Sequence, residues 1–270
     1  MIKNVIGTIF SVLTATILYA QGVSISPSRI FFSAKSGETM QEKLLISNSS
    51  NKEYFFQISL KDWKRDSLGR KLFSEPGTSP TSNARWVEME EGNIVRIGPN
   101  QKKEVRVSLK HPDSLQQPRL SNSMLFFTQF TPQSDTLQEV GKMGVRVLFE
   151  FGIHLYHTPI SAGPPDIAFM EFQDAGLVES TQGKMRQIRL KVKNSGERVS
   201  DSNIRLELTN KTDGQETLLE PIGVSLMPGE EQWVSFFAPV SLKGNYLGAS
   251  IAEVIGTSRK RIAEKDLIFE

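Results

Sequence analysis

Apolar and polar residues alternate with a period of two through much of the chain after residue 21. The pattern is clear in Tyr54–Lys61 and Val105–Lys110, where every second residue is apolar. This period places one face of a β-strand in a core and leaves the other in solvent. Polar turns separate such segments about every ten residues, so the chain is predicted to be all-β. Further strands are expected at Val23–Phe32, Glu42–Asn48, Ser123–Thr131 and Met143–Tyr156.

A proline-rich break divides the pattern into two parts. Residues 158–165 read Thr-Pro-Ile-Ser-Ala-Gly-Pro-Pro, a composition that favours neither a helix nor a sheet ladder. We therefore predict two immunoglobulin-like β-sandwich domains, residues 21–158 and 166–270, joined by a linker at 159–165. Strands of the second domain are expected at Ile188–Lys193, Ile204–Leu208, Gln232–Phe237, Tyr246–Ile255 and Lys265–Phe269.

The first twenty residues have the organisation of a secretory signal peptide. Lys3 precedes the uncharged stretch Val5–Ala20, and Ala20 offers a small residue at a cleavage site before Gln21. An uncleaved membrane anchor is the alternative, but the stretch is short for a span of about 20 apolar residues. We predict a signal peptide at residues 1–20, export, and no stable membrane insertion after cleavage.

Composition removes several classes of function. The 270 residues carry a formal net charge of +2, which gives no strong field for nucleic acid. With no cysteine, the chain has no disulfide, thiolate metal site or thiol nucleophile. His154 and His157 would point to opposite faces of a regular strand, and no catalytic motif is present. We therefore expect no catalytic residue, no metal, no cofactor, no nucleic-acid partner and no enzyme activity. The basic segments 61–65 and 259–261 are interpreted as solvated faces.

The segment Met143–Tyr156 is unusually long for a strand with one apolar face. Its odd positions, from Met143 to Leu155, are all apolar. At about 3.3 Å per residue it would extend about 46 Å, beyond the usual strand length. Either the whole apolar row belongs to the core of its own domain, or part of it pairs with another chain. The residues alone leave both alternatives open.

Five segments in matching order resemble the periplasmic pilus-assembly chaperones of the PapD-like family. The opening strand 22–32 carries an arginine followed by apolar residues, and 46–50 is similar to the family's V-x-N-x-S turn. The segments 95–107, 123–132 and 152–159 resemble the family's later strands and turns. The resemblance covers roughly residues 22–160; the second domain is similar in strand pattern alone.

The resemblance implies two sandwiches at an angle and a cleft that holds the C-terminal carboxylate of a client protein. By position, Arg29 would be the anchor, and His154 stands where the family has a lysine. A histidine of pKa about 6.5 would make its charge depend on pH. The donated strand would present Val145, Val147 and Phe149, with Met143 and Phe151 as outer candidates.

The expected function is that of a periplasmic chaperone without ATP. It would bind partly folded fimbrial or cell-surface subunits by β-strand addition and carboxylate anchoring; the resemblance also leaves open an outer-membrane usher as partner. The alternative is a structural or adhesive β-sandwich component of a cell-surface or secretion assembly, secreted or on the surface. Geometry separates the two: the chaperone needs Arg29 near His154 at the interdomain cleft and Val145–Phe149 on an accessible edge.

Overall fold

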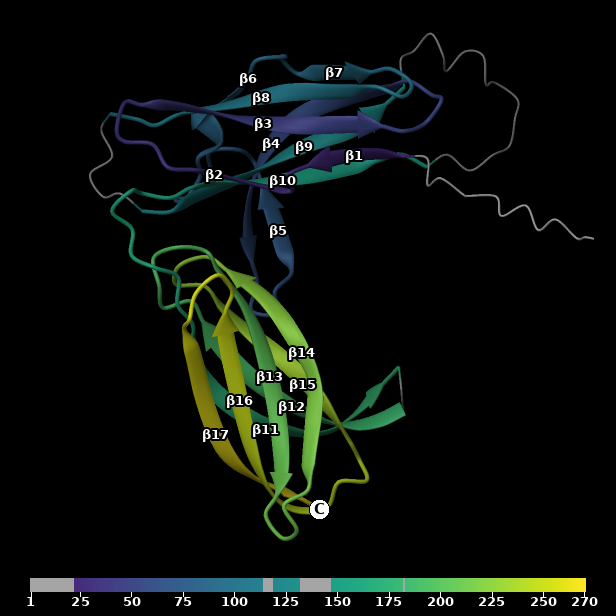
Figure 1. The fold of residues 1–270 in the computed structure, drawn as a ribbon, viewed down its shortest axis with the longest axis vertical. Helices are drawn as coiled ribbons and strands as arrows, with labels where there is room; N and C mark the ends of the chain where they lie inside the picture. The colour runs from purple at the N-terminus through teal and green to yellow at the C-terminus, as the bar shows by residue number, and fades with distance from the viewer. Residues whose placement is uncertain (1–21, 114–118, 132–146, 182) are drawn as a thin grey trace, which may run out of the picture.

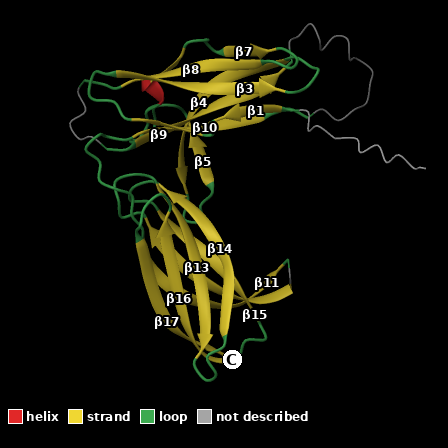
Figure 2. Cartoon of the chain, in the orientation of Figure 1, coloured by secondary structure: helices red, strands yellow, loops and turns green. Residues whose placement is uncertain are grey.

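The protein folds into two β-sandwiches that meet at an angle (Figures 1 and 2). A computed structural model describes residues 22–113, 119–131, 147–181 and 183–270. The strands of the first sandwich run in a clearly different direction from those of the second. The predicted all-β fold of two immunoglobulin-like sandwiches is confirmed. The predicted signal peptide at residues 1–20 lies outside the described residues.

The first sandwich consists of two sheets that enclose an apolar core. One sheet has the strand order β1-β3-β8-β6; the other has the order β2-β10-β9-β4-β5, with β7 paired to β4. A short 3-10 helix, Ala84–Trp86, precedes β6. The strands are β1 (Val23–Ser26), β2 (Arg29–Phe32), β3 (Thr39–Asn48), β4 (Tyr54–Arg65), β5 (Lys71–Ser74), β6 (Val87–Met89), β7 (Ile94–Ile97), β8 (Lys102–Lys110), β9 (Ser121–Phe130) and β10 (Glu150–His157).

The alternation that predicted these strands also positions the core. Phe56 of β4 and Val105, Val107 and Leu109 of β8 are fully buried, while the residues between them in β8 face outward. Burying each such side chain stabilises the fold by about 1.5–3 kcal/mol. With no disulfide available, this burial is the main source of stability in the first sandwich.

The first predicted strand is split in two by a proline. β1 pairs antiparallel with β3 in one sheet, and β2 pairs parallel with β10 in the other. Pro27 lies between β1 and β2, after a cis peptide bond with Ser26. Because proline has no amide hydrogen, a regular ladder ends there. The chain therefore changes sheets at Pro27, and Arg29 begins the strand that lies beside β10.

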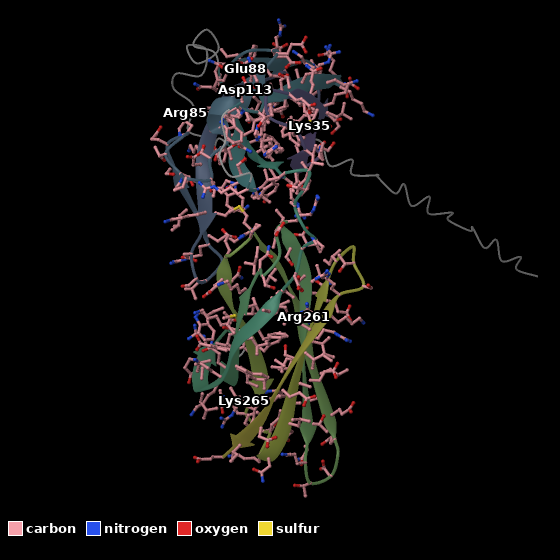
Figure 3. All side chains as sticks on the ribbon, turned by 90° about the vertical axis from the view of Figure 1, so that its left-hand side faces the viewer. Lys35, Arg85, Glu88, Asp113, Arg261 and Lys265 are labelled. Atoms are coloured by element: carbon pink, nitrogen blue, oxygen red, sulfur yellow. The ribbon has the colours of Figure 1, made fainter. Side chains whose placement is uncertain are left out.

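The second sandwich has sheets of order β11-β12-β15 and β14-β13-β16-β17. Lys265, labelled in Figure 3, donates a hydrogen bond of 2.6 Å from its Nζ to the Phe172 carbonyl and so joins the edges of the two sheets. The strands are β11 (Ala168–Ser180), β12 (Gly183–Lys193), β13 (Ser200–Asn210), β14 (Glu216–Leu226), β15 (Glu231–Pro239), β16 (Gly244–Val254) and β17 (Lys260–Phe269).

A single asparagine organises the turn after β3 in the first sandwich. Asn48 is buried, and its Nδ2 donates to the carbonyls of Lys52 and Gly98, each at 2.7 Å. Its Oδ1 accepts from the backbone amide of Ser50 at 3.0 Å. These bonds tie the β3–β4 turn to the turn that precedes β8.

The same arrangement recurs after β12 in the second sandwich. The Nδ2 of buried Asn194 donates to the carbonyls of Arg198 and Leu226, each at 2.8 Å. Its Oδ1 accepts from the backbone amide of Gly196 at 2.8 Å. Asn48 and Asn194 thus perform the same task in the two halves of the chain, each bridging a polar turn and a proline-containing turn.

The predicted linker is bound to the second sandwich. The guanidinium of Arg198 donates to the carbonyls of Gly163 and Ala162 at 3.2 and 3.1 Å. A Cβ on Gly196 would lie 2.4 Å from the backbone nitrogen of Asp166, so this close approach requires glycine. The turn that Asn194 organises therefore also seats the linker.

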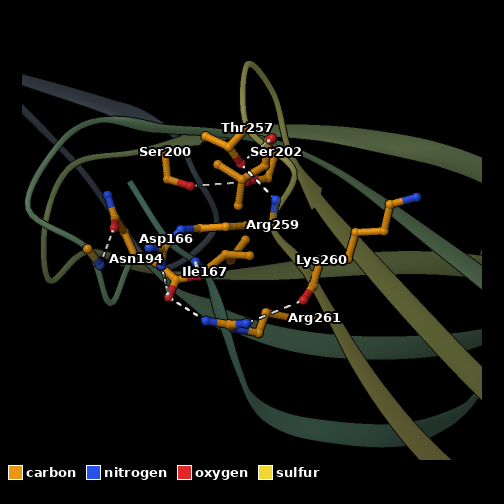
Figure 4. Close-up of polar contacts among 11 residues, drawn as sticks. Asp166, Ile167, Asn194, Ser200, Ser202, Thr257, Arg259, Lys260 and Arg261 are labelled. Carbon is orange, nitrogen blue, oxygen red and sulfur yellow. Dashed lines mark hydrogen bonds and ion pairs between the residues drawn. The ribbon is translucent and has the colours of Figure 1, made fainter. Parts of the chain in front are cut away.

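Asp166 fixes the end of this connection. Its Oδ2 accepts hydrogen bonds from Arg259 at 3.2 Å and from Arg261 at 2.6 Å (Figure 4). Burial raises the pKa of the Asp166 carboxyl, but the amide of Ile167 and the two arginines act in the opposite direction, and the net pKa is lowered. Arg259 and Arg261 remain 40% and 45% exposed, so the segment 259–261 is a solvated face as predicted, and its two arginines also pair with Asp166.

Candidate functional site

Arg29 lies at the junction between the two sandwiches. In the parallel pair of β2 and β10, Arg29 is directly opposite His154. Its Nη1 donates to both carboxylate oxygens of Asp201, each at 2.8 Å, and Asp201 belongs to β13 of the second sandwich. The two side chains remain 38% and 32% exposed. The structure thus places Arg29 and His154 together at the junction between the two sandwiches.

His154 is enclosed by aromatic side chains. Its ring lies edge-on to Trp63, with ring centroids 4.6 Å apart, and its Nδ1 is 3.4 Å from the hydroxyl of Tyr156. Burial, together with the charges of Lys71, Arg65 and Arg29, lowers the pKa of His154 to about 3. The ring is therefore uncharged at neutral pH. The pH-dependent charge that an ordinary histidine would carry here is absent.

Two basic residues that were not among the predicted site residues, Arg65 and Lys71, lie near His154. Arg65 ends β4 and Lys71 begins β5, a hairpin that extends from the first sandwich toward the second (Figure 1). Both residues act on the His154 ring. Burial, followed by the charge of Arg65, lowers the pKa of Lys71. Lys71 has no ion-pair partner among the residues that the structure describes.

The segment 61–65 contains the signal that could have identified this cluster. It was interpreted as a solvated face, which is wrong for Asp62 and Trp63 because both are buried. Asp62 accepts hydrogen bonds from the amides of Thr78 and Ser79 at 2.8 and 2.7 Å. Trp63 stands between charged residues just before the turn 66–69, at the end of a strand that extends from the core of the first sandwich toward the second.

An apolar cluster connects the two sandwiches beneath these charges. Trp63 and Tyr156 of the first sandwich pack with Met227 of the second, and all three are buried. Beside this cluster, the backbone amide of Trp233 donates to the Ser67 carbonyl at the tip of the β4–β5 hairpin, at 2.8 Å. The second sandwich is therefore held by apolar packing and by a backbone hydrogen bond as well as by Arg29.

The balance of charge at the junction is positive. Burial raises the pKa of the Tyr156 hydroxyl. Burial also raises the pKa of the Glu230 carboxyl, against the hydrogen bonds from the Met227 and Arg65 amides and the charge of Arg65. When Asp201 and Glu230 are both ionised, the three cations Arg29, Arg65 and Lys71 still leave one positive charge in excess. Such a site suits an incoming carboxylate. The charged residues that act on His154 or Tyr156 are Arg29, Arg65, Lys71, Asp201 and Glu230.

β10 offers an open edge at its beginning. β9 pairs with all of β10, whereas β2 lies beside His154–His157. Within the described residues, no strand pairs with Glu150–Ile153 on the β2 side. Val147 and Leu148 precede the strand and are 70% and 53% exposed. Met143 and Val145 lie outside the described residues.

The later members of the apolar row pack on their own domain. Phe149 and Phe151 are half-buried against the core of the first sandwich. Phe149 lies edge-on to Tyr54 at 6.0 Å between ring centroids, and Phe151 lies edge-on to Phe56 at 5.9 Å. The described part of the row therefore divides: Val147 faces solvent, and the two phenylalanines complete the core.

Among the residues that the structure describes, no cluster of three or more metal-ligating side chains could hold an ion. The same residues contain no helix long and apolar enough to cross a bilayer.

No family model matches this chain, and no curated protein matches it. Fimbrial chaperones recur among the solved structures that align with it. The class 5 fimbriae chaperone CfaA is 10% identical, with a TM-score of 0.49 and coverage of 90% of this chain and 99% of that one. The chaperone DraB of E. coli is 16% identical, with a TM-score of 0.47 and coverage of 91% and 98%. The Pseudomonas aeruginosa CupB2 chaperone is 15% identical, with a TM-score of 0.46 and coverage of 90% and 100%.

Proposed function

We propose that this protein is a periplasmic chaperone that works without ATP. It binds partly folded fimbrial or cell-surface subunits by adding a β-strand to them and by anchoring their C-terminal carboxylate. The observation that carries the proposal is the edge of β10 at Glu150–Ile153, which no described strand covers on the β2 side and which exposed Val147 precedes. A subunit that lacks a strand has unpaired backbone groups, and an open edge with apolar side chains satisfies both its ladder and its core.

The anchor in this proposal is Arg29, with Lys71 as the second cation. β10 connects strand addition with carboxylate anchoring. The same strand that has the open edge also places His154 opposite Arg29. The neutral His154 does not supply the second charge at neutral pH. Lys71 from the neighbouring hairpin does, and it is exposed. A client strand would then run along β10 with its carboxylate end toward the cleft.

A structural or adhesive component of a surface assembly is the second candidate. Phe149 and Phe151 favour it, because they already belong to the core of the first sandwich and so are not available to a partner. The buried cluster that Trp63 and Met227 share across the two sandwiches also suits a rigid module. In this case the protein would be secreted or would lie at the cell surface, and fractionation of cells distinguishes these locations from the periplasm.

Crosslinking in cells tests the proposal directly. A photoreactive residue in place of Val147 is expected to capture a subunit, identified by mass spectrometry, and Ile262 provides the matched control because it is a similarly exposed apolar residue on β17 of the second sandwich. An outer-membrane usher, if one acts on this protein, would appear in the same experiment. Equal capture from both positions, or none from Val147, would favour the structural candidate.

Loss of the anchor is expected to reduce capture without unfolding the protein. Arg29→Ala removes a partly exposed guanidinium and leaves the core unchanged, so the captured subunit should fall strongly in amount. Arg96→Ala is the control, because Arg96 forms an exposed ion pair with Glu53 away from the cleft. Unchanged capture by Arg29→Ala would remove Arg29 from the site.

A further inference from the structure

The anchor residue of the proposed site already holds a carboxylate. Both oxygens of Asp201 lie 2.8 Å from Nη1 of Arg29, and they come from the other sandwich. Among the described residues, no partner of the Nε or Nη2 atoms of Arg29 is found. The guanidinium is thus occupied on one side by a group with the same chemistry as the terminus of a client.

We propose that Asp201 is an internal competitor for the client's carboxylate. This inference rests on the proposed chaperone function. In the free protein Asp201 neutralises Arg29 and closes the cleft across β2 and β13. On binding, the client's terminal carboxylate takes the place of Asp201 on Arg29, so capture is an exchange of one carboxylate for another.

Because the Arg29–Asp201 ion pair is partly exposed, breaking it costs little free energy. Arg29 and Asp201 are 38% and 32% exposed, and ion pairs with this access to water contribute little to stability. An incoming carboxylate therefore does not have to break a strong bond. Asp201, once released, keeps its place in β13 because its backbone carbonyl accepts from the amide of Ile255 at 2.8 Å.

The exchange also loosens one of the contacts between the two sandwiches. Other contacts between the sandwiches do not involve Arg29: Met227 belongs to the buried cluster of Trp63, and the Trp233 amide donates to Ser67. The Arg65 amide also donates to Oε1 of Glu230 at 3.4 Å. Release of Asp201 therefore changes the cleft on the β2 side while the hairpin side stays docked. Client binding and the position of β13 are coupled through this single ion pair.

Peptide binding to Asp201→Asn tests the exchange. The probe is a fluorescein-labelled synthetic peptide of alternating valine and threonine, made with a C-terminal carboxylate and with a C-terminal amide, and binding is followed by fluorescence anisotropy. We expect the variant to bind the carboxylate peptide about two- to fivefold more tightly than the unsubstituted protein, the range of an exposed ion pair. Binding of the amide peptide should not change. Arg29→Ala combined with Asp201→Asn should bind no better than Arg29→Ala alone.

Asp266→Asn is the matched control, because it removes the same charge from an exposed ion pair between Asp266 of β17 and Lys211. A gain equal to that of Asp201→Asn would show a general charge effect and overturn the inference. So would unchanged or weaker carboxylate binding by Asp201→Asn. If Asp201→Asn unfolds, Asp201→Ser serves as the second variant. Equal binding of the two peptides by the unsubstituted protein would instead contradict the carboxylate anchor itself, so the two failures are distinguishable.

Discussion

The imidazole of His154 lies edge-on against the indole of Trp63, with an interplanar angle of 74° and 4.6 Å between the ring centroids. The indole is fixed in turn, because its Nε1 donates to the carbonyl of buried Ser123 at 3.2 Å. His154 therefore acts as a neutral aromatic residue at the boundary of the interdomain apolar cluster. Burial and the three neighbouring cations keep its pKa near 3.

Replacement of His154 by glutamine should reduce the loss of stability in acid. Between pH 6.5 and about 3, the unfolded chain binds a proton at His154 that the folded chain does not bind. The stability of the unsubstituted protein therefore falls as the pH decreases through 6.5. His154→Gln lacks this contribution, so its urea midpoint should change less between about pH 7 and pH 4.5.

Glu230 provides the control of opposite sign. Burial raises the pKa of its carboxyl above 4.5, so the folded chain binds the proton more readily than the unfolded chain. Its contribution is present at low pH and is lost as the pH rises through the folded pKa. Glu230→Gln should therefore make the acid loss of stability steeper. If His154→Gln and the unsubstituted protein lose stability in parallel, His154 is not buried as a neutral ring.

The two hydrogen bonds that Nδ2 of Asn194 donates should contribute more to the free energy of unfolding than the one that its Oδ1 accepts. Asn194→Asp keeps an oxygen for the Gly196 amide but turns a carboxylate toward the carbonyls of Arg198 and Leu226. Leaving buried groups unsatisfied costs about 1–3 kcal/mol each, and more where a charge is involved. We expect Asn194→Asp to lower the free energy of unfolding by about 3 kcal/mol.

Urea denaturation measures this loss, and Asn203→Ala is the control. Asn203 is an exposed residue of β13 in the same sandwich, so its replacement should change the free energy of unfolding by less than about 0.5 kcal/mol. Asn48→Asp should reproduce the loss in the first sandwich. A loss at Asn194 as small as that at Asn203 would mean that the asparagine does not organise the turn.

Regular alternation made much of the fold predictable from the sequence. It identified β4, β8, β12 and β16, because each has one face in a core. β14 was missed because Pro221 and Gly223 interrupt its pattern; an edge strand tolerates both, since part of its ladder is unpaired. β11 was missed for a related reason, because irregularities in its pairing with β12 shift the alternation.

The site was predictable in part. The resemblance selected Arg29 and His154, and the strand register places them opposite each other. Arg65 and Lys71 were not assigned. The aromatic Trp63 within a charged segment marked the strand, but alternation along one strand does not report that the hairpin bends toward the other sandwich. The neutral state of His154 depends on burial and on the charges of Lys71, Arg65 and Arg29, which lie far from it in sequence. Whether Val145, Val147 and Phe149 act as a donated row stays a prediction.

Replacement of Gly196 by alanine should destabilise the second sandwich. An added Cβ would meet the backbone nitrogen of Asp166 at 2.4 Å and the Pro164 carbonyl oxygen at 2.6 Å, and neither can move without displacing the linker. Such overpacking costs about 1–3 kcal/mol, so the thermal midpoint should fall clearly. Gly223→Ala is the control, because its Cβ would make an ordinary contact of 3.6 Å with Asn203. Equal midpoints of the two variants would contradict the close approach of the linker.

Replacement of Met227 by alanine should separate the unfolding of the two sandwiches. Met227 is the buried residue through which the second sandwich enters the cluster of Trp63 and Tyr156. Truncation of a buried methionine costs about 2–5 kcal/mol, here mostly at the contact between the sandwiches. We expect calorimetry to show one transition for the unsubstituted protein and two for Met227→Ala. Met170→Ala is the control, because Met170 is 50% exposed on β11, and it should leave the single transition intact. A single transition at an unchanged midpoint for Met227→Ala would mean that the charged contacts, rather than the apolar cluster, couple the two halves.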